Sequence, residues 1–263
     1  MKGLREYTEK IIDFYYFSGT GNTLLIVKEI IDFFRKNNFK ANYYKIEKTD
    51  PHQLDTRHII GLGFPVAVQG TYPFVWQFMK NLPDAHSTPL FLIDTMLLYS
   101  GGVLNPVKKI IKRKGYIPIG AEEFIMPGNV FVKEGMNDKK KVKINRALGK
   151  AIKFAEKLLD GRARWFDLPL YSDLMAMISQ SKRNWKFFES ITPIRVDKNK
   201  CDSCGLCEKL CPVNNIRFAK YPEFLNHCVL CMRCFAYCPE EAISFKNYHS
   251  AQYRAVEVNE LLI

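Results

Sequence analysis

All eight cysteines of this 263-residue chain lie in two short runs that share one spacing. Each run follows the pattern C-x2-C-x2-C-x3-C, with a proline directly after the last cysteine. The second run repeats the first at a constant offset, that from Cys201 to Cys228, and the same offset relates Ile216 to Ile243. Thiolates at this spacing are ligands for a soft metal centre, so the runs predict metal-based chemistry and an internal repeat with pseudo-twofold symmetry. The runs are Cys201, Cys204, Cys207, Cys211 and Cys228, Cys231, Cys234, Cys238.

Three thiolates spaced three positions apart on a tight loop can bind one face of a cuboidal cluster, whereas the fourth ligand must come from elsewhere. The segment from about residue 195 to 250 resembles the bacterial two-cluster ferredoxins, in which the last cysteine of each run binds the other cluster. The resemblance implies two [4Fe–4S] clusters with exchanged fourth ligands. One set would be Cys201, Cys204, Cys207 and Cys238; the other would be Cys228, Cys231, Cys234 and Cys211.

Two other kinds of cysteine site remain open. Disulfides would require an oxidising compartment, and no export signal is visible in the sequence. Zinc also binds four thiolates, so two zinc sites are a conceivable alternative. His227 adjoins Cys228 and is interpreted as a surface histidine, with a tuning role for the adjacent centre as the alternative.

A second group of polar residues follows an apolar run near the start of the chain. Ile11–Phe17 is rich in β-branched and aromatic residues and predicts a buried strand. Apolar residues then recur at helical spacing from Leu24 to Phe34. The loop between strand and helix presents backbone N–H groups and the positive end of a helix, which suit an anion. This loop consists of Ser18, Gly19, Thr20, Gly21, Asn22 and Thr23.

The loop does not match the two commonest nucleotide motifs. It lacks the Gly-Lys-Ser/Thr step of a Walker-A loop, and Gly19-x-Gly21 has no third glycine for a dinucleotide fingerprint. The pattern resembles the phosphate loop of flavodoxins, which implies that Ser18–Thr23 bind the phosphate of FMN. An ordinary glycine turn is the alternative.

Further strands and helices alternate through the first part of the chain, up to about position 160. This pattern predicts an α/β fold with a doubly wound sheet, whose ligands bind at the carboxyl ends of the strands. The flavodoxin resemblance implies five parallel strands in the order 2-1-3-4-5. The remaining strands are expected at 41–46, 58–64, 90–94 and 116–125, and helices at 73–81, 103–114 and 138–159.

The loops after strands three and four would bind the isoalloxazine ring, again by resemblance to flavodoxins. Tyr99 is the candidate for stacking on the ring. Tyr72 and Trp76 are possible covers of the ring, but both fit helix packing better. The loop after strand five is Met126–Asn129. The expected ring contacts are Phe64, Pro65, Val66, Thr95, Tyr99, Gly101 and Gly102.

The motifs divide the chain into three parts. Residues 1–160 are expected to form the flavodoxin-like domain, and residues 194–263 a small α+β two-cluster ferredoxin domain with a C-terminal tail. Residues 161–193 would be a helical connector, since Leu170, Ile178 and Trp185 lie near one face of a helix. That apolar face is expected to pack one domain against the other.

The chain carries a formal charge of +12, with lysine-rich stretches at 108–114 and 139–143. These stretches are interpreted as solvated helix faces, with docking of redox partner proteins that have acidic surfaces as the alternative. No nucleic-acid-binding module accompanies the charge, and no apolar run is long enough to span a membrane. A cytoplasmic protein is therefore expected, and its oligomeric state is left open.

The combination resembles the flavodoxin–ferredoxin fusion proteins of anaerobic bacteria and archaea. It implies an intracellular electron-transfer protein that relays electrons between FMN, two [4Fe–4S] clusters and external redox partners. One alternative is an FMN-dependent reductase of a small substrate, for which Asp94 and Tyr99 lie in suitable loops. A second alternative is a redox adaptor whose first domain binds a partner but no flavin.

Overall fold

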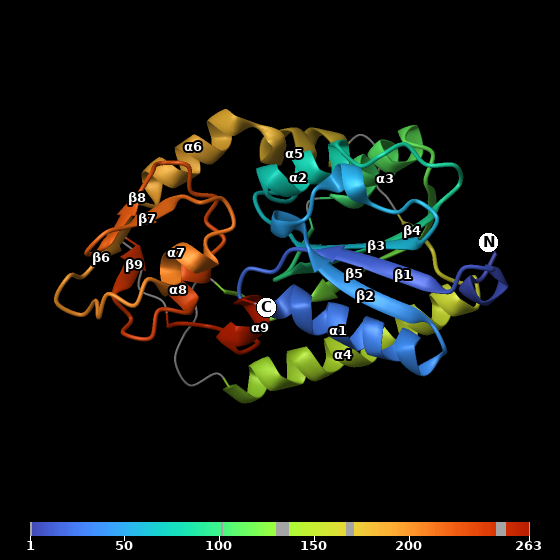
Figure 1. The fold of residues 1–263 in the computed structure, drawn as a ribbon, viewed down its shortest axis with the longest axis horizontal. Helices are drawn as coiled ribbons and strands as arrows, with labels where there is room; N and C mark the ends of the chain where they lie inside the picture. The colour runs from blue at the N-terminus through green and yellow to red at the C-terminus, as the bar shows by residue number, and fades with distance from the viewer. Residues whose placement is uncertain (1, 101, 130–136, 167–170, 246–250, 263) are drawn as a thin grey trace.

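The structure is a computed structural model that describes residues 2–100, 102–129, 137–166, 171–245 and 251–262. Its main element is a parallel five-stranded sheet with the strand order β2-β1-β3-β4-β5 (Figure 1). This order is that of the flavodoxin-like doubly wound fold and confirms the predicted fold class. The strands are β1 (Ile11–Tyr16), β2 (Lys40–Lys45), β3 (Ile59–Pro65), β4 (Pro89–Met96) and β5 (Ile117–Ile125).

Helices cover both faces of this sheet, because the side chains of the three central strands β1, β3 and β4 are buried on both sides. α1 (Asn22–Lys36) and α4 (Asn137–Leu159) cover one face, where Phe91 and Ile93 of β4 enter the core. α2 (Pro73–Lys80) and α3 (Leu104–Arg113) cover the other face, where Leu90 and Leu92 point. Short 3-10 turns at Leu4–Glu6, Ile46–Lys48 and Pro51–Gln53 complete this lobe.

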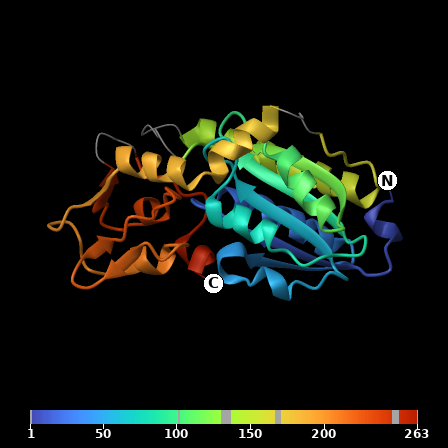
Figure 2. The same ribbon diagram turned by 90° about the horizontal axis from the view of Figure 1, so that it is seen from above.

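The connector forms two helices, so the expectation of a single helix is wrong. α5 (Tyr171–Gln180) ends before Ser181, whose backbone is extended and whose Oγ accepts a hydrogen bond from the Asn184 N–H at 3.4 Å. A serine in this position caps the new helix α6 (Lys182–Ile191). This helix runs from the part that contains the five-stranded sheet, which we call the sheet lobe, toward the part from residue 194 to 245, which we call the cysteine lobe (Figure 2). Leu170 lies outside the described residues.

The cysteine lobe repeats its backbone with the offset that the sequence predicts. Left-handed φ angles recur at Ser203 and Leu230 (65° and 52°) and at Gly205 and Met232 (69° and 67°). β6 (Ile194–Val196) pairs antiparallel with β9 (Ile243–Phe245), and β7 (Ile216–Phe218) pairs with β8 (Pro222–Phe224). The corresponding short helices are α7 (Leu206–Leu210) and α8 (Arg233–Ala236).

The end of the chain returns to the sheet lobe. α9 (Val258–Leu262) lies beside α1, where Glu260 pairs with Lys28 and Leu261 is buried in the core that α1 shares (Figure 1). The sequence assigns the tail to the ferredoxin-like part, but in the structure it packs on both lobes. No helix among the described residues combines the length and the apolar character needed to cross a membrane.

Candidate functional site

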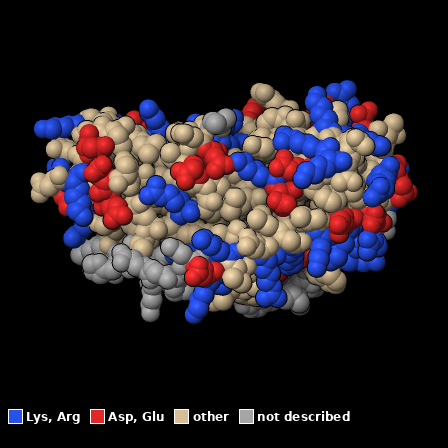
Figure 3. Space-filling view, turned by 90° about the horizontal axis from the view of Figure 1, so that it is seen from below, with Lys and Arg blue, Asp and Glu red and all other residues tan. Residues whose placement is uncertain are grey.

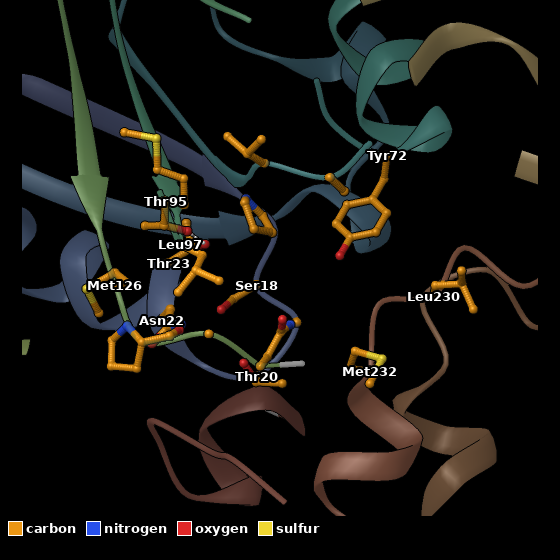
Figure 4. A pocket seen from close by; sticks show the side chains of 18 of the residues that line it. Ser18, Thr20, Asn22, Thr23, Tyr72, Thr95, Leu97, Met126, Leu230 and Met232 are labelled. Carbon is orange, nitrogen blue, oxygen red and sulfur yellow. Dashed lines mark hydrogen bonds between the residues drawn. The ribbon is translucent and has the colours of Figure 1, made fainter. Parts of the chain in front are cut away.

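A cavity of about 360 Å³ lies where the carboxyl ends of the parallel strands meet the cysteine lobe. We call it the sheet-edge cavity. Its size falls within the range of small-molecule sites, and its position is where doubly wound folds bind ligands. Figure 4 shows Ser18 and Thr95 on the sheet side and Leu230 and Met232 on the opposite side. It is lined by Ser18, Gly19, Thr20, Asn22, Thr23, Pro65–Val68, Tyr72, Thr95–Leu97, Met126–Asn129, Leu230 and Met232.

Three side chains of the Ser18–Thr23 loop, those of Ser18, Asn22 and Thr23, form hydrogen bonds within the protein. Ser18 Oγ accepts from the Leu24 N–H at 3.3 Å, and the Thr23 and Thr95 hydroxyls lie 2.8 Å apart. Asn22 donates to the Pro127 carbonyl at 2.8 Å. These contacts hold the loop rigid and direct the first turn of α1 toward the cavity. The loop therefore fits an anion bound mainly by backbone N–H groups, as the phosphate of FMN would require.

The expected ring contacts divide into two groups. Pro65, Val66 and Thr95 line the sheet-edge cavity, but Phe64 is fully buried in the core and points away from it. Side chains alternate along a strand, so Phe64 shares the face of Leu62 rather than that of its neighbours.

The loop after β4 also differs from the expectation. Tyr99 is 51% exposed and does not line the cavity. Gly102 has a φ of 79°, and a Cβ there would lie 2.7 Å from the Ser172 Cβ, so it packs against α5. Gly101 lies outside the described residues.

Sequence reasoning favoured helix packing for Tyr72, with a cover of the ring as the other possibility, and missed further residues that line the cavity. Tyr72 is buried, and its hydroxyl points toward the cavity in Figure 4. Burial raises the pKa of this hydroxyl, so it holds its proton at neutral pH. Leu230 and Met232 lie between the cysteines of the second run. The first run has Ser203 and Gly205 at the equivalent positions, so the repeat itself already showed that these two positions are apolar only in the second run.

The Ser18–Thr23 loop, which we call the phosphate-type loop, contacts the second cysteine run directly. A Cβ added to Gly19 would lie 2.5 Å from the backbone oxygen of Cys231. Gly21 has a φ of 99°, and a Cβ there would meet the backbone nitrogen of Val256 at 2.8 Å. The glycines therefore allow the cysteine loop and the tail to pack against Ser18–Thr23.

Replacing Gly19 with alanine is expected to destabilise the protein by about 1–3 kcal/mol, because the new methyl group overlaps the Cys231 carbonyl. Thermal unfolding under anaerobic conditions should show a midpoint lower by several degrees. Gly149 is the matched control, since it lies in α4 with nothing within 4 Å of an added Cβ. Gly149→Ala should stabilise the protein by about 0.5–1 kcal/mol. An unchanged midpoint for Gly19→Ala would contradict this packing.

The structure brings cysteines of the two runs together. Cys211 lines one cavity with three thiols of the second run, and we call Cys211, Cys228, Cys231 and Cys234 the inner set. The outer set is Cys201, Cys204, Cys207 and Cys238. Burial raises the pKa of Cys207 to about 11, with smaller contributions from the nearby Cys204 and Cys238 thiols. The last thiols have equivalent surroundings, because Cys211 accepts a hydrogen bond from the Asn215 N–H and Cys238 from the Ala242 N–H.

All eight cysteines are free thiols. Burial raises the pKa of Cys231 to about 11 and that of Cys228 to about 12, so cluster binding would have to displace protons. Within the described residues, no group of three or more His, Cys, Asp or Glu side chains could hold a metal ion. The inner set nevertheless fits a cluster in its donor chemistry, with four soft ligands around one cavity.

Arg233 links the two lobes from the centre of the second run. Its guanidinium is 4% exposed and lies 2.6 Å from the equally buried Glu47 carboxylate. It also donates to the carbonyls of Ser18 at 2.9 Å and Leu210 at 3.3 Å. The guanidinium carbon lies 4.6 Å from the centroid of the Phe17 ring. Arg233 therefore ties the end of β1 to the cysteine lobe.

Asp94 is not in a loop, in contrast to the sequence-based expectation. It lies inside β4 with no exposed surface, and its two carboxyl oxygens have no hydrogen-bond partner among the described residues. Burial raises its pKa well above the usual value, and the nearby Glu123 carboxylate raises it further. This carboxyl does not line the sheet-edge cavity.

Comparisons with known proteins support the iron–sulfur assignment of the first run. The family model for a 4Fe-4S binding domain matches residues 194–217. An uncharacterised protein of Methanocaldococcus jannaschii, MJ0749, is 34% identical over 59 residues, which is 22% of this chain. The match spans 23% of that protein's own length.

Several solved flavodoxin structures are similar to just over half of this chain. A flavodoxin from the domain Archaea has a TM-score of 0.43 at 13% identity and covers 56% of this chain and 98% of its own. A short-chain flavodoxin associated with a bacterial microcompartment has a TM-score of 0.45 at 16% identity, covering 58% and 99%. The fold assignment rests on the strand order itself. The chain thus combines a flavodoxin-like α/β fold with a segment similar to 4Fe-4S binding domains.

Proposed function

We propose that this chain is an electron-transfer protein in which FMN binds in the sheet-edge cavity and two [4Fe–4S] clusters bind to the inner and outer cysteine sets. One observation carries the proposal. The phosphate-type loop and a cysteine loop form opposite walls of the same cavity. A flavin accepts one or two electrons and a cluster accepts one, so their combination connects one-electron and two-electron redox partners.

The residues of the cavity are suited to binding and orienting a flavin. The loop Ser18–Thr23 would hold the phosphate with backbone N–H groups. Val66, Leu97 and Met126 provide apolar surface for the ring and exclude water from one side. Tyr72 supplies the one ionisable side chain among the described lining residues, and its raised pKa keeps it neutral.

The external partners would be redox proteins with acidic docking surfaces, given the formal charge of +12. Figure 3 shows Lys and Arg side chains interspersed with Asp and Glu on the face seen from below. Steering by net charge is therefore expected to raise the association rate and to weaken with ionic strength.

A reductase of a small substrate is the second candidate, and the Tyr72 hydroxyl in the cavity is the observation in its favour. As a neutral phenol it can donate a hydrogen bond to a substrate beside a flavin ring. Asp94 and Tyr99 no longer support this candidate, since neither lines the cavity. A flavin-free adaptor would leave the fixed geometry of the Ser18–Thr23 loop without a ligand.

Anaerobically purified protein is expected to contain about eight iron atoms, about eight acid-labile sulfides and one FMN per chain. Metal analysis and flavin extraction measure these contents. Zinc in place of iron would refute the cluster assignment, and failure to bind added FMN would refute the assignment of the cavity. Steady-state reduction of a small substrate without a protein partner would favour the reductase over the carrier.

A further inference from the structure

The two halves of the cysteine repeat face different surroundings. Asp202, Glu208 and Lys209 of the first half are exposed. Their counterparts in the second half, Val229, Phe235 and Ala236, are buried. Of these, Val229 packs in the core cluster of α2 and α3, and Ala236 in that of α1 and α4. The second half is therefore turned toward the sheet lobe, and the first half toward solvent.

The sheet-edge cavity and the cavity of the inner cysteine set share one wall. Leu230 and Met232 line both cavities, and both belong to the loop that carries Cys231. The backbone oxygen of Cys231 in turn lies against Gly19 on the opposite side of the interface. Within the described residues, no thiol of the outer set lines either cavity.

The wall residues occupy a backbone conformation that costs energy. Leu230 and Met232 have φ angles of 52° and 67°, where a side chain other than glycine, asparagine or aspartate is disfavoured. The same turns in the first half use Ser203 and Gly205. Local strain of this kind is retained at functional sites, and here it occurs at two apolar residues that line both cavities.

We propose that the cluster of the inner set is the one that exchanges electrons with FMN, across the wall of Leu230 and Met232. The cluster of the outer set, whose Cys204 is exposed, exchanges electrons with the external redox protein. This order rests on the proposed function. In the reducing direction, the outer cysteine set would hold the cluster that accepts one electron at a time from the external donor protein, and the inner set would hold the cluster that passes it on toward the sheet-edge cavity. Two such electrons, each lost by a donor protein, and one proton from solvent would balance a two-electron reduction of bound FMN.

The double variant Leu230→Ser/Met232→Gly tests the wall, because it installs the residues of the first half at the equivalent turns. It relieves the strain at position 232 and removes the apolar surface. We expect the clusters to be retained and the dissociation constant for FMN to rise about tenfold, as the loss of one to two buried apolar contacts implies. Gly205→Met is the matched control in the outer half. At a φ of 69° it introduces the same backbone strain that Met232 carries, but away from the sheet-edge cavity, so it should leave FMN affinity unchanged.

Spectroscopy of the loaded protein tests the order. Cys204→Ala should perturb the EPR signal of the outer cluster and thereby assign it. Binding of FMN to the reduced wild-type protein should shift the other signal, that of the inner cluster. Binding of FMN should shift the inner-cluster signal less in the Leu230→Ser/Met232→Gly variant than in the wild type. If the double variant does not fold, Met232→Gly alone serves, since glycine adopts this φ without strain.

The outcomes separate the two proposals. Protein without FMN or without iron–sulfur clusters would refute the proposed function itself. Protein with both cofactors, in which FMN shifts the outer signal, would overturn only the order. Wall variants that bind FMN within twofold of the wild-type affinity would also overturn the order.

Discussion

Replacing Cys211 with alanine is expected to damage the cluster that holds Cys228, Cys231 and Cys234, although Cys211 belongs to the other run. Cys211 lines the cavity of these three thiols, and no other described thiol of its own run does so. Losing the fourth ligand should lower the iron content from about eight atoms per chain to about four, or to about seven if a three-iron cluster survives. Iron analysis combined with EPR of the reduced protein measures both the loss and the identity of the cluster.

The matched control is Cys238→Ala, which removes the equivalent cysteine of the second run. Its thiol lies with Cys204 and Cys207, so the outer cluster should be damaged instead. The two variants should therefore lose different EPR signals, and FMN affinity should fall more in Cys211→Ala because the inner loop forms the wall of its cavity. Loss of the outer signal in Cys211→Ala would show that each run binds its own cluster.

Periodic features of the sequence predicted most of the fold. Buried parallel strands are continuous apolar runs, so β1 and β4 were visible as Ile11–Phe17 and the stretch around Leu90–Asp94. The internal repeat of the cysteine runs predicted the paired turns of the cysteine lobe, because ligand spacing fixes the local backbone there. Local signals of this kind require no knowledge of the rest of the chain.

Contacts between distant segments were less accessible. Pro65 and Val66 at the end of β3 and Thr95 in β4 line the cavity, as expected of these segments. Strand parity buries Phe64, and Tyr99 lies beyond the end of β4 and is exposed, so neither contact could be predicted from the order of the strands. The break between α5 and α6 depends on Ser181, a capping residue inside an apolar helical pattern. The repeat did mark Met232 and Arg233, because the equivalent positions of the first run hold Gly205 and Leu206. Such a difference between the two halves indicates that the second half has different surroundings.

Replacing Arg233 with methionine is expected to lower the free energy of unfolding by about 3–5 kcal/mol, because the buried Glu47 carboxylate loses its cation. The variant also loses two hydrogen bonds to the carbonyls of Ser18 and Leu210. Methionine keeps most of the apolar volume, so lost packing contributes little. Chemical denaturation of the anaerobic protein measures the change.

The exposed pair Arg217–Glu223 in the same lobe is the matched control. Its atoms lie 2.8 Å apart, about as close as those of Arg233 and Glu47, but the two side chains are 68% and 56% exposed. Solvent screens such a pair, so Arg217→Met should cost less than about 1 kcal/mol. Equal effects of the two replacements would contradict the role assigned to burial.

The double variant Arg233→Met/Glu47→Met separates the electrostatic cost from the role of Arg233 in joining the lobes. Removing both charges should recover much of the stability, since an apolar pair can replace a buried ion pair at little cost. The Ser18 carbonyl would still lack its donor, so the end of β1 would no longer be tied to the cysteine loop. FMN affinity should then stay below wild type even where stability returns. Recovery of both quantities together would show that Arg233 stabilises the fold without positioning the phosphate-type loop.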